Sequence, residues 1–170
     1  MNTEVLSEEE FNDLIMEYGT EILRLCYLYL KDYQLSEDAC QEIFLKVYKN
    51  FYKFKGNSSI KTWITRICIN TCKNYLRSSW FKRITLSSEK IINKNISNED
   101  VFEEINKSDL FNCVMKLKPK YKDVILMYYY QQCTIKEIAQ ILEITEVNVS
   151  TRLFRARKKL KRDIGGVLFE

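Results

Sequence analysis

The chain carries six cysteines and no histidine, which restricts the chemistry that its side chains can perform. The missing imidazole removes the commonest general base and one partner of most nucleophilic dyads. There is no Gly-rich phosphate loop, GxSxG or HExxH sequence, and no two cysteines form a CxxC pair. The sequence therefore predicts no enzyme, no cofactor and no metal site, with carboxylate or lysine chemistry as the remaining enzymatic alternative. The cysteines, at positions 26, 40, 68, 72, 113 and 133, are expected to be reduced and mostly buried.

Charged residues are segregated along the chain, although the net charge is only +4. Residues 1–21 hold seven acidic residues and no lysine or arginine. Residues 51–88 hold eight basic residues and no acid, and residues 147–162 hold seven and no acid. Basic blocks on this scale are typical of surfaces that bind a polyanion, because each neutralised phosphate releases counterions. A basic run at a helix end also complements the helix dipole, so charge alone leaves a solvated surface as the alternative.

The C-terminal basic block lies on the second of two short predicted helices. The first helix has an apolar stripe at positions 138, 139, 141 and 142, and Thr145 is the expected N-cap of the second. The stripe of the second helix continues at steps of four, three and four, through Val149, Leu153, Ala156 and Leu160. A helix that is buried on one side and cationic on the others suits a DNA major groove. The pattern predicts a helix-turn-helix.

The first basic block begins on a predicted loop at residues 51–59, FYKFKGNSS, where aromatic residues alternate with lysines. This composition suits single-stranded nucleic acid, because an unstacked base can stack on a ring while lysines hold the backbone. A helix expected over residues 59–79 buries Ile60, Ile64, Ile67, Cys68 and Thr71 and exposes Arg66, Asn70, Lys73, Asn74 and Arg77. Trp63 is either a core residue or a stacking platform near the loop.

Two earlier helices are expected to support this loop. The first runs from an N-cap at Ser7 to about Asp32, either continuous or broken near Gly19. The second begins after Ser36 and turns Ala39, Cys40, Ile43, Phe44 and Val47 inward. Its outward residues, Glu37, Asp38, Gln41 and Glu42, form either a partner-binding surface or a capped and solvated first turn.

Low proline and glycine content and the helical periodicities predict an all-α fold with two small helical domains joined by a flexible linker. We place the domains at residues 1–81 and 109–170 and the linker at residues 82–108, which are polar and weakly periodic. The second domain restarts near Ser108 and turns at Lys118–Pro119. No run of 18 apolar residues is present and the N-terminal sequence is acidic, so we expect a cytoplasmic protein without a signal peptide or an integral membrane segment.

With these residues identified, the chain resembles the extracytoplasmic-function (ECF) group of bacterial RNA polymerase sigma factors from about residue 11 to residue 162. The segment from Asp38 to Phe44, DACQEIF, is similar to the group's D-hydrophobic-V-Q-E-x-F. The segment from Phe54 to Asn70 is similar to F-x-G-x-S-x-x-x-T-W-L-x-x-I-A-x-N, and Arg77 stands where the group usually has arginine. Residues 137–157 are similar to the group's E-I-A-x-x-L-G…T-V-x-S-R-L-x-R-A-R helix-turn-helix.

The resemblance implies three sets of contact residues and no catalytic residues. Binding to core RNA polymerase, at its largest-subunit clamp and flap, is implied for Asp38, Gln41, Glu42, Phe44 and Leu45. Contact with melted minus-ten DNA, with one base flipped into the loop, is implied for Lys55, Asn57, Ser58, Lys61, Trp63, Arg66, Asn70, Lys73, Asn74 and Arg77. Contact with minus-35 duplex is implied for Asn148, Ser150, Thr151, Arg152, Phe154, Arg155, Lys158 and Lys159. An anti-sigma protein that covers these surfaces is a further implied partner.

The chain departs from the group's pattern at the turn of the helix-turn-helix. Glu143 stands where the group has glycine, so either a non-glycine residue adopts a positive φ or the turn differs. Val147, Asn148 and Ser150 replace the group's usual residues, which leaves the preferred minus-35 bases open.

These features predict a promoter-specificity subunit in which Thr151 and Arg155 face bases while Arg152, Lys158 and Lys159 contact phosphates. The alternative is a stand-alone helix-turn-helix regulator that binds operator DNA as a dimer. A purely protein-binding helical adaptor is a third alternative, which the basic blocks disfavour.

Overall fold

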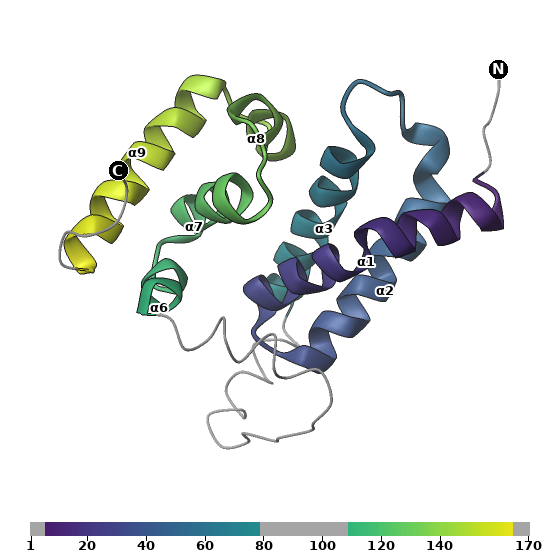
Figure 1. The fold of residues 1–170 in the computed structure, drawn as a ribbon, viewed down its shortest axis with the longest axis horizontal. Coiled ribbons are helices and arrows are strands. Elements are labelled where there is room, and N and C mark those ends of the chain that lie inside the picture. Colours follow the sequence, from purple (N-terminus) through teal and green to yellow (C-terminus); the bar gives the residue numbers. More distant parts are fainter. Residues whose placement is uncertain (1–5, 79–108, 165–170) are drawn as a thin grey trace. The chain divides into compact units, whose positions relative to one another are not determined.

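The computed structural model describes residues 6–78 and 109–164, and the chain divides into two compact units, Met1–Lys94 and Asn95–Glu170. All regular secondary structure within the described residues is helical (Figure 1). The predicted all-α fold with two helical units is therefore confirmed. The predicted linker at residues 82–108 lies outside the described residues. Below, the N-terminal unit means residues 6–78 and the C-terminal unit means residues 109–164.

The N-terminal unit contains α1 (Glu8–Leu30), α2 (Tyr33–Asn50), the short 3-10 helix η1 (Phe51–Lys53) and α3 (Ile60–Arg77). Each α-helix contacts the other two, and α1 crosses the pair formed by α2 and α3 (Figure 1). The fully buried side chains at their junction are Leu25, Cys26, Ala39, Ile43, Val47, Ile64, Cys68 and Cys72. A three-helix core of this kind holds the chain segments on either side of the η1–α3 loop in fixed positions.

The start of α1 is as predicted, whereas the start of α2 differs. Ser7 and Glu10 form a reciprocal capping box, and α1 continues through Gly19 without a break. The side chain of Asp32 caps α2 by accepting a hydrogen bond of 2.8 Å from the backbone N–H of Leu35. The predicted start after Ser36 is therefore wrong by about one turn. Ser36 is buried inside the helix, where its hydroxyl donates to the carbonyl of Asp32.

The segment that leads into α3 is partly helical rather than entirely a loop. Its first three residues form η1, and the chain then turns through Gly56, whose φ of 67° is favourable for glycine. Ser59 caps α3 as the sequence predicts, accepting from the backbone N–H of Thr62 at 3.1 Å. Of the residues predicted to be buried, Ile64, Cys68 and Thr71 are buried, whereas Ile60 and Ile67 are only half-buried.

The C-terminal unit is built from shorter elements around one long helix. They are α6 (Asp109–Met115), α7 (Pro119–Ile125), the π-helical turn η2 (Leu126–Tyr130), α8 (Ile135–Leu142) and α9 (Glu146–Asp163). Helix α9 contacts α6, α7 and α8. Proline occupies the first turn of α7, as predicted, because its missing N–H is not needed there. The π-helical turn was not predicted.

The helix-turn-helix forms with the predicted cap and the predicted buried stripe. Thr145 caps α9 by accepting from the backbone N–H of Asn148 at 3.2 Å. The four stripe residues from Val149 to Leu160 are 0 or 1% exposed. Glu143 ends α8 with φ 55° and ψ 45°, so a non-glycine residue adopts the left-handed conformation. Of the two alternatives for this turn, the first is therefore correct.

Within residues 6–78 and 109–164, none of the helices combines the length and the hydropathy that a membrane crossing requires.

Candidate nucleic-acid interface

Three aromatic rings close the base of the loop between η1 and α3. The ring centroids of Phe51 and Phe54 are 6.0 Å apart. The Trp63 ring meets Phe51 edge-on at 6.1 Å and meets Phe54 at 5.4 Å. All three side chains are half-buried, and pairs at these distances and angles are favourable beyond simple burial. Trp63 is therefore not a fully buried core residue, because it braces the loop while part of its surface stays exposed, and its role as a stacking platform stays a prediction.

An open pocket of about 270 Å³ lies beside Trp63, between α2, η1 and α3. Its walls combine the indole ring with cationic and amide side chains, namely Lys46, Asn50, Lys53, Trp63, Ile67, Asn70, Thr71 and Asn74. Polar groups in the walls hold one another in place. Lys46 donates to the hydroxyl of Thr71 at 3.0 Å, and Lys53 donates to the side-chain oxygen of Asn50 at 2.8 Å. An aromatic wall with convergent amides and amines can take a planar ring and hydrogen-bond its edge.

The pocket includes residues that the sequence pattern did not single out for this site. Lys46 and Asn50 are one turn apart near the end of α2, and the side-chain amide of Asn50 donates to the carbonyl of Lys46 at 2.9 Å. Their spacing of four residues was the only local signal that both share a face. Their approach to α3 depends on packing between helices, which no local pattern specifies.

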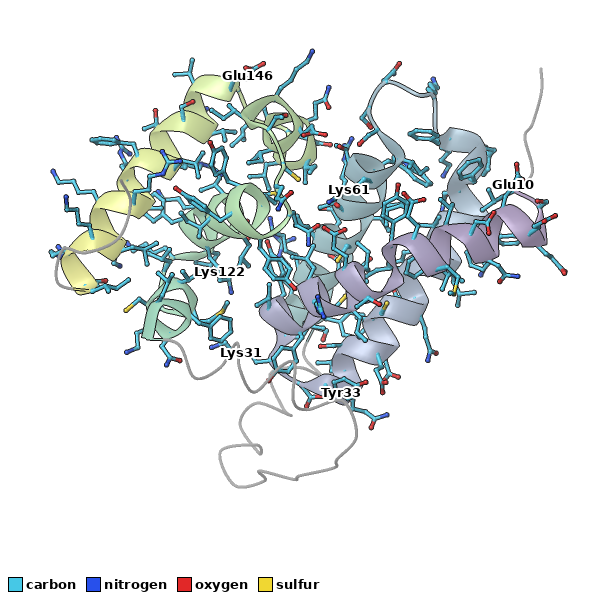
Figure 2. All side chains as sticks on the ribbon, viewed as in Figure 1. Glu10, Lys31, Tyr33, Lys61, Lys122 and Glu146 are labelled. Atoms are coloured by element: carbon cyan, nitrogen blue, oxygen red, sulfur yellow. The ribbon has the colours of Figure 1, made fainter. Side chains whose placement is uncertain are left out.

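Most residues of the predicted minus-ten set lie on the loop or on the outer face of α3. The exposed members are Lys55, Asn57, Arg66, Asn70, Asn74 and Arg77, and the half-buried members are Ser58, Lys61, Trp63 and Lys73. Lys61 differs from the others because its ammonium lies 2.8 Å from the carboxylate of Glu21 on α1 (Figure 2 labels Lys61). That partner offsets part of its charge, so Lys61 is a weaker candidate for phosphate contact than Lys55.

The outer face of α2 carries the acidic surface that the sequence predicts. Asp38 and Gln41 are exposed, and Leu45 is 54% exposed. The carboxylate of Glu42 accepts a 2.8 Å hydrogen bond from the hydroxyl of Tyr75 and forms an ion pair with Lys46. Burial raises the pKa of Glu42, but the hydrogen bonds from Lys46 and Tyr75 outweigh it and leave this pKa below its ordinary value. Burial and the hydrogen bond to Glu42 raise the pKa of Tyr75.

Phe44 does not belong to this surface. Its side chain is 5% exposed and packs in the core of the N-terminal unit, so the prediction that it contacts a partner directly needs correction. Leu45, the next residue along α2, points outward instead, because successive helical residues face directions about 100° apart. Phe44 supports the acidic surface from beneath.

The outer face of α9 gathers exposed residues of mixed chemistry. Val147 is 74% exposed and Phe154 is 66% exposed, and both are large apolar side chains without burial in the C-terminal unit. Among the predicted minus-35 residues, Asn148, Ser150, Phe154, Arg155 and Lys158 are exposed, and Thr151, Arg152 and Lys159 are half-buried. Glu146 marks the first turn of this helix (Figure 2). An exposed helix face with amide, hydroxyl, apolar and cationic groups can contact both base edges and phosphates.

Two side chains of α9 have internal partners that limit their freedom. The hydroxyl of Thr151 donates to the carbonyl of Val147 at 2.8 Å, one turn earlier. Arg157 donates from Nε to the hydroxyl of Tyr129 at 2.7 Å, and its guanidinium lies 5.2 Å from the ring centre of Tyr128. The Arg157 side chain therefore ties α9 to the π-helical turn through a cation–π contact and a hydrogen bond.

Comparison with known protein families matches both units of the chain. Residues 14–82 match Sigma-70 region 2, and residues 108–160 match Sigma-70, region 4. The first match includes α2, the loop and α3, and the second includes α8 and most of α9.

Curated proteins similar to the chain are sigma factors of bacteria. The ECF RNA polymerase sigma factor SigW of Bacillus subtilis is 28% identical over 169 residues, covering 92% of this chain and 90% of that protein. The ECF RNA polymerase sigma-E factor of Haemophilus influenzae is 26% identical over 171 residues, covering 92% of this chain and 88% of that protein.

Two solved structures with the same fold are complexes with a second protein. The structure of CnrH in complex with the cytosolic domain of CnrY has a TM-score of 0.69 at 18% identity and covers 94% of this chain and 90% of that chain. The sigma factor RpoE of Bartonella quintana, crystallised with the anti-sigma factor NepR, has a TM-score of 0.68 at 18% identity and covers 92% of this chain and 99% of that chain. At these identities the likeness establishes the fold alone.

Proposed function

Because the chain belongs to the extracytoplasmic-function group of RNA polymerase sigma factors, we propose that it directs core polymerase to promoters by binding melted minus-ten DNA and minus-35 duplex at separate surfaces. The observation that carries this proposal is that each unit gathers its motif residues on one exposed face. In the N-terminal unit that face is the loop with α3, and in the C-terminal unit it is the outer face of α9.

In the N-terminal unit, the pocket beside Trp63 accepts one base that has left the DNA stack. Its volume of about 270 Å³ exceeds that of a single nucleobase, and the indole offers a surface for stacking. Asn70 and Asn74 project from successive turns of α3 into the pocket lining, where their amides can hydrogen-bond a base edge. Arg66 and Arg77, both exposed, hold the single strand by its phosphates.

In the C-terminal unit, the first three turns of α9 enter the major groove. Arg155 and Asn148 are exposed and can donate to base edges, with Thr151 beside them. Phe154 offers an apolar contact for a thymine methyl group. Lys158, one turn beyond Phe154, and the half-buried Lys159 contact phosphates and add affinity without sequence preference.

The acidic face of α2 binds core polymerase in this proposal. Asp38 and Gln41 supply polar contacts, and Leu45 supplies an exposed apolar one. The Tyr75–Glu42–Lys46 contacts fix the Glu42 carboxylate on α2 before any partner arrives, which lowers the ordering cost of binding. Since core polymerase is cytoplasmic, the protein acts in the cytoplasm.

An anti-sigma protein is a further proposed partner. Support comes from the RpoE of Bartonella quintana, whose structure was solved with the anti-sigma factor NepR. For this chain, such a partner would cover the acidic face of α2 or the DNA-binding faces, and would compete with core polymerase.

The decisive experiment is run-off transcription with core polymerase, followed by mapping of the start sites. The wild-type chain should confer start-site selection that core polymerase lacks. Arg155→Ala should relax preference at one minus-35 position, while Lys158→Ala should weaken all promoters by a similar factor. Lys120→Ala is the matched control, because Lys120 is an exposed lysine of the same unit on α7. If core polymerase initiates at the same positions with and without the chain, the proposal is wrong.

A DNA mobility-shift experiment with the same purified protein distinguishes this proposal from the stand-alone helix-turn-helix regulator. A dimeric regulator would shift duplex operator DNA in the absence of polymerase, whereas the proposed sigma factor should do so weakly and should co-purify with core polymerase. Two weak sites on one chain give useful affinity only when both are engaged, because the second contact then occurs at high effective concentration.

A further inference from the structure

Three cysteine side chains meet in the core of the N-terminal unit. Cys26 comes from α1, and Cys68 and Cys72 come from successive turns of α3. Their sulfur atoms all lie within 4.8 Å of one another, and the Sγ atoms of Cys26 and Cys68 are 3.8 Å apart. Each of the three side chains is 0% exposed, and none is in a disulfide. We call these three residues the thiol cluster.

The thiol cluster has chemistry that simple packing does not require. A single buried cysteine behaves as a small apolar residue. Neighbouring thiols can also form weak S–H···S hydrogen bonds with one another. Hydrogen bonds from Cys26 and then from Cys68 lower the pKa of Cys72, although burial opposes this shift. Metals bind cysteine as the thiolate, so three sulfurs this close together can offer three soft ligands to one ion once their protons are displaced.

From this arrangement we propose that Cys26, Cys68 and Cys72 form a buried three-sulfur site for a thiophilic divalent cation of the zinc type, Zn²⁺ or Cd²⁺. Three sulfurs at about 2.3 Å from one ion lie roughly 3.8 to 4.0 Å apart, as the metal–sulfur distance of such sites requires. The Sγ atoms of Cys26 and Cys68 already have this separation, and the third sulfur lies within 4.8 Å of both. Coordination thus needs sulfur movements of less than about 1 Å.

Charge favours a divalent over a monovalent soft cation at this site. Three thiolates leave one net negative charge with a divalent ion and two with a monovalent ion, and buried charge is costly. Lys46 on α2 adds a weak favourable electrostatic effect at Cys72, although its ammonium is already paired with Glu42. Each thiol that becomes a ligand loses its proton, so the ion replaces protons and no oxidant or reductant is needed.

The site would connect α1 to the helix that carries the proposed DNA pocket. Cys72 follows Thr71 and Cys68 follows Ile67, and both Thr71 and Ile67 line that pocket. A cation bound to the folded unit and not to the unfolded chain stabilises the fold by mass action. Metal supply would then set how rigidly α3 presents the pocket, a property separate from promoter recognition itself.

The test uses the full-length wild-type chain, reduced and refolded with either Zn²⁺ or Cd²⁺, because the closed core admits an ion most readily during folding. We expect one bound ion per chain, and a rise in Tm of about 10 °C at saturating ion. Cd²⁺ should also produce an ultraviolet sulfur-to-cadmium charge-transfer band. Binding of Cd²⁺ alone would identify a site with three ligands, since Zn²⁺ prefers four.

The matched variants are Cys72→Ala and Cys133→Ala. Cys133 is 6% exposed and lies in the C-terminal unit, outside the thiol cluster. Cys133→Ala should keep the ion, whereas Cys72→Ala should bind it about 100-fold more weakly or worse. Equal binding by both variants would overturn the proposal.

The wild-type chain decides the matter even if Cys72→Ala fails to fold. Absence of the cadmium band and of any Tm rise would show that the three thiols only fill space. If neither cation binds and mild oxidation lowers the mass of the protein by two hydrogens, two of the three cysteines form a disulfide. That result would likewise overturn the metal site.

Discussion

The two units present their candidate DNA-binding residues in opposite ways. In the N-terminal unit the pocket is formed by residues of α2, η1 and α3. Its aromatic wall, Trp63, is half-buried because the same ring also packs beneath the loop. In the C-terminal unit the candidate residues all belong to one helix, α9, whose buried stripe is separate from its exposed face. Binding and stability should therefore be coupled in the N-terminal unit and largely independent in the C-terminal unit.

The difference follows from what each surface has to bind. A base that leaves its stack must be enclosed on several sides, so its pocket needs side chains from several elements. A duplex presents its edges in an open groove, and a single helix is sufficient to reach them. In the N-terminal unit, residues that line the pocket therefore also pack between the helices of that unit.

The largest expected contrast is between the aromatic residues of the two surfaces. Trp63→Ala should destabilise the N-terminal unit by about 2 kcal/mol, less than the roughly 3 to 5 kcal/mol of a fully buried aromatic because Trp63 is half-buried. It should also reduce open-complex formation about tenfold, since one base–aromatic stack contributes about 1 to 3 kcal/mol. Denaturant unfolding and a promoter-opening assay would measure the two effects.

Phe154→Ala is the counterpart in the C-terminal unit. Because its ring is 66% exposed, its loss should change stability by less than about 0.5 kcal/mol. It should still weaken minus-35 binding by about 1 kcal/mol, the lower end of what one base contact contributes. A large loss of stability in Phe154→Ala, or none in Trp63→Ala, would remove the distinction between the units.

Sequence patterns predicted the C-terminal unit better than the pocket, for the same reason. The stripe from Val149 to Leu160 and the Thr145 cap are local features, since helical spacing and one capping side chain specify them. The pocket depends on Lys46 approaching Thr71 across 25 residues of sequence. No spacing within one helix encodes such a contact.

The same reasoning explains the errors in the N-terminal unit. Asp32 and Ser36 are both good capping residues and are four positions apart, so local preference did not separate them. Burial of Leu35 and Ser36 against the rest of the unit places the helix start at Tyr33. Likewise, Cys68 and Cys72 share a face of α3 because they are four residues apart, but the approach of Cys26 from α1 depends on packing between helices.

Helix caps should have similar effects in both units, which makes them a control on the comparison. Ser59→Ala removes the cap of α3, and Thr145→Ala removes the cap of α9. Each should cost about 1 kcal/mol, because one backbone N–H of the first turn loses its partner. In the N-terminal unit the loss should also impair promoter opening, because Ser59 joins the loop to α3. Thermal unfolding with the opening assay would reveal whether only Ser59→Ala affects both properties.

Residues in the left-handed backbone conformation at helix ends should give a smaller effect, and substitution there should stabilise the protein. Lys31 ends α1 and Glu143 ends α8, each with φ 55°, where a side chain is strained and glycine is not. Lys31→Gly and Glu143→Gly should each stabilise the protein by about 0.5 to 1 kcal/mol. Lys31→Ala and Glu143→Ala are the controls, because alanine keeps the strain. A stabilising alanine substitution at either position would show that the backbone conformation is not the cause.

The smallest expected difference between the units is in how the stability lost on removing one tyrosine hydroxyl depends on pH. The folded protein holds the pKa of Glu42 below its ordinary value, since hydrogen bonds from Lys46 and Tyr75 outweigh the opposing effect of burial. A lowered folded-state pKa stabilises the protein above the unfolded pKa, and this stability is lost as pH falls through the folded pKa. Tyr75→Phe should therefore cost a few tenths of a kcal/mol near neutral pH, a small value because the Glu42 side chain is 41% exposed, and nothing in acid.

Tyr129→Phe is the matched change in the C-terminal unit, where the tyrosine hydroxyl accepts a hydrogen bond from Arg157. Arginine stays protonated across this range, so the cost of Tyr129→Phe should not vary between neutral and acidic pH. Urea unfolding of both variants at several pH values would compare them directly. If the cost of the two substitutions depended on pH in the same way, the Tyr75–Glu42 contact would not be the source of the pH-dependent stability. The acidic face of α2 would then be no more preorganised than the exposed face of α9.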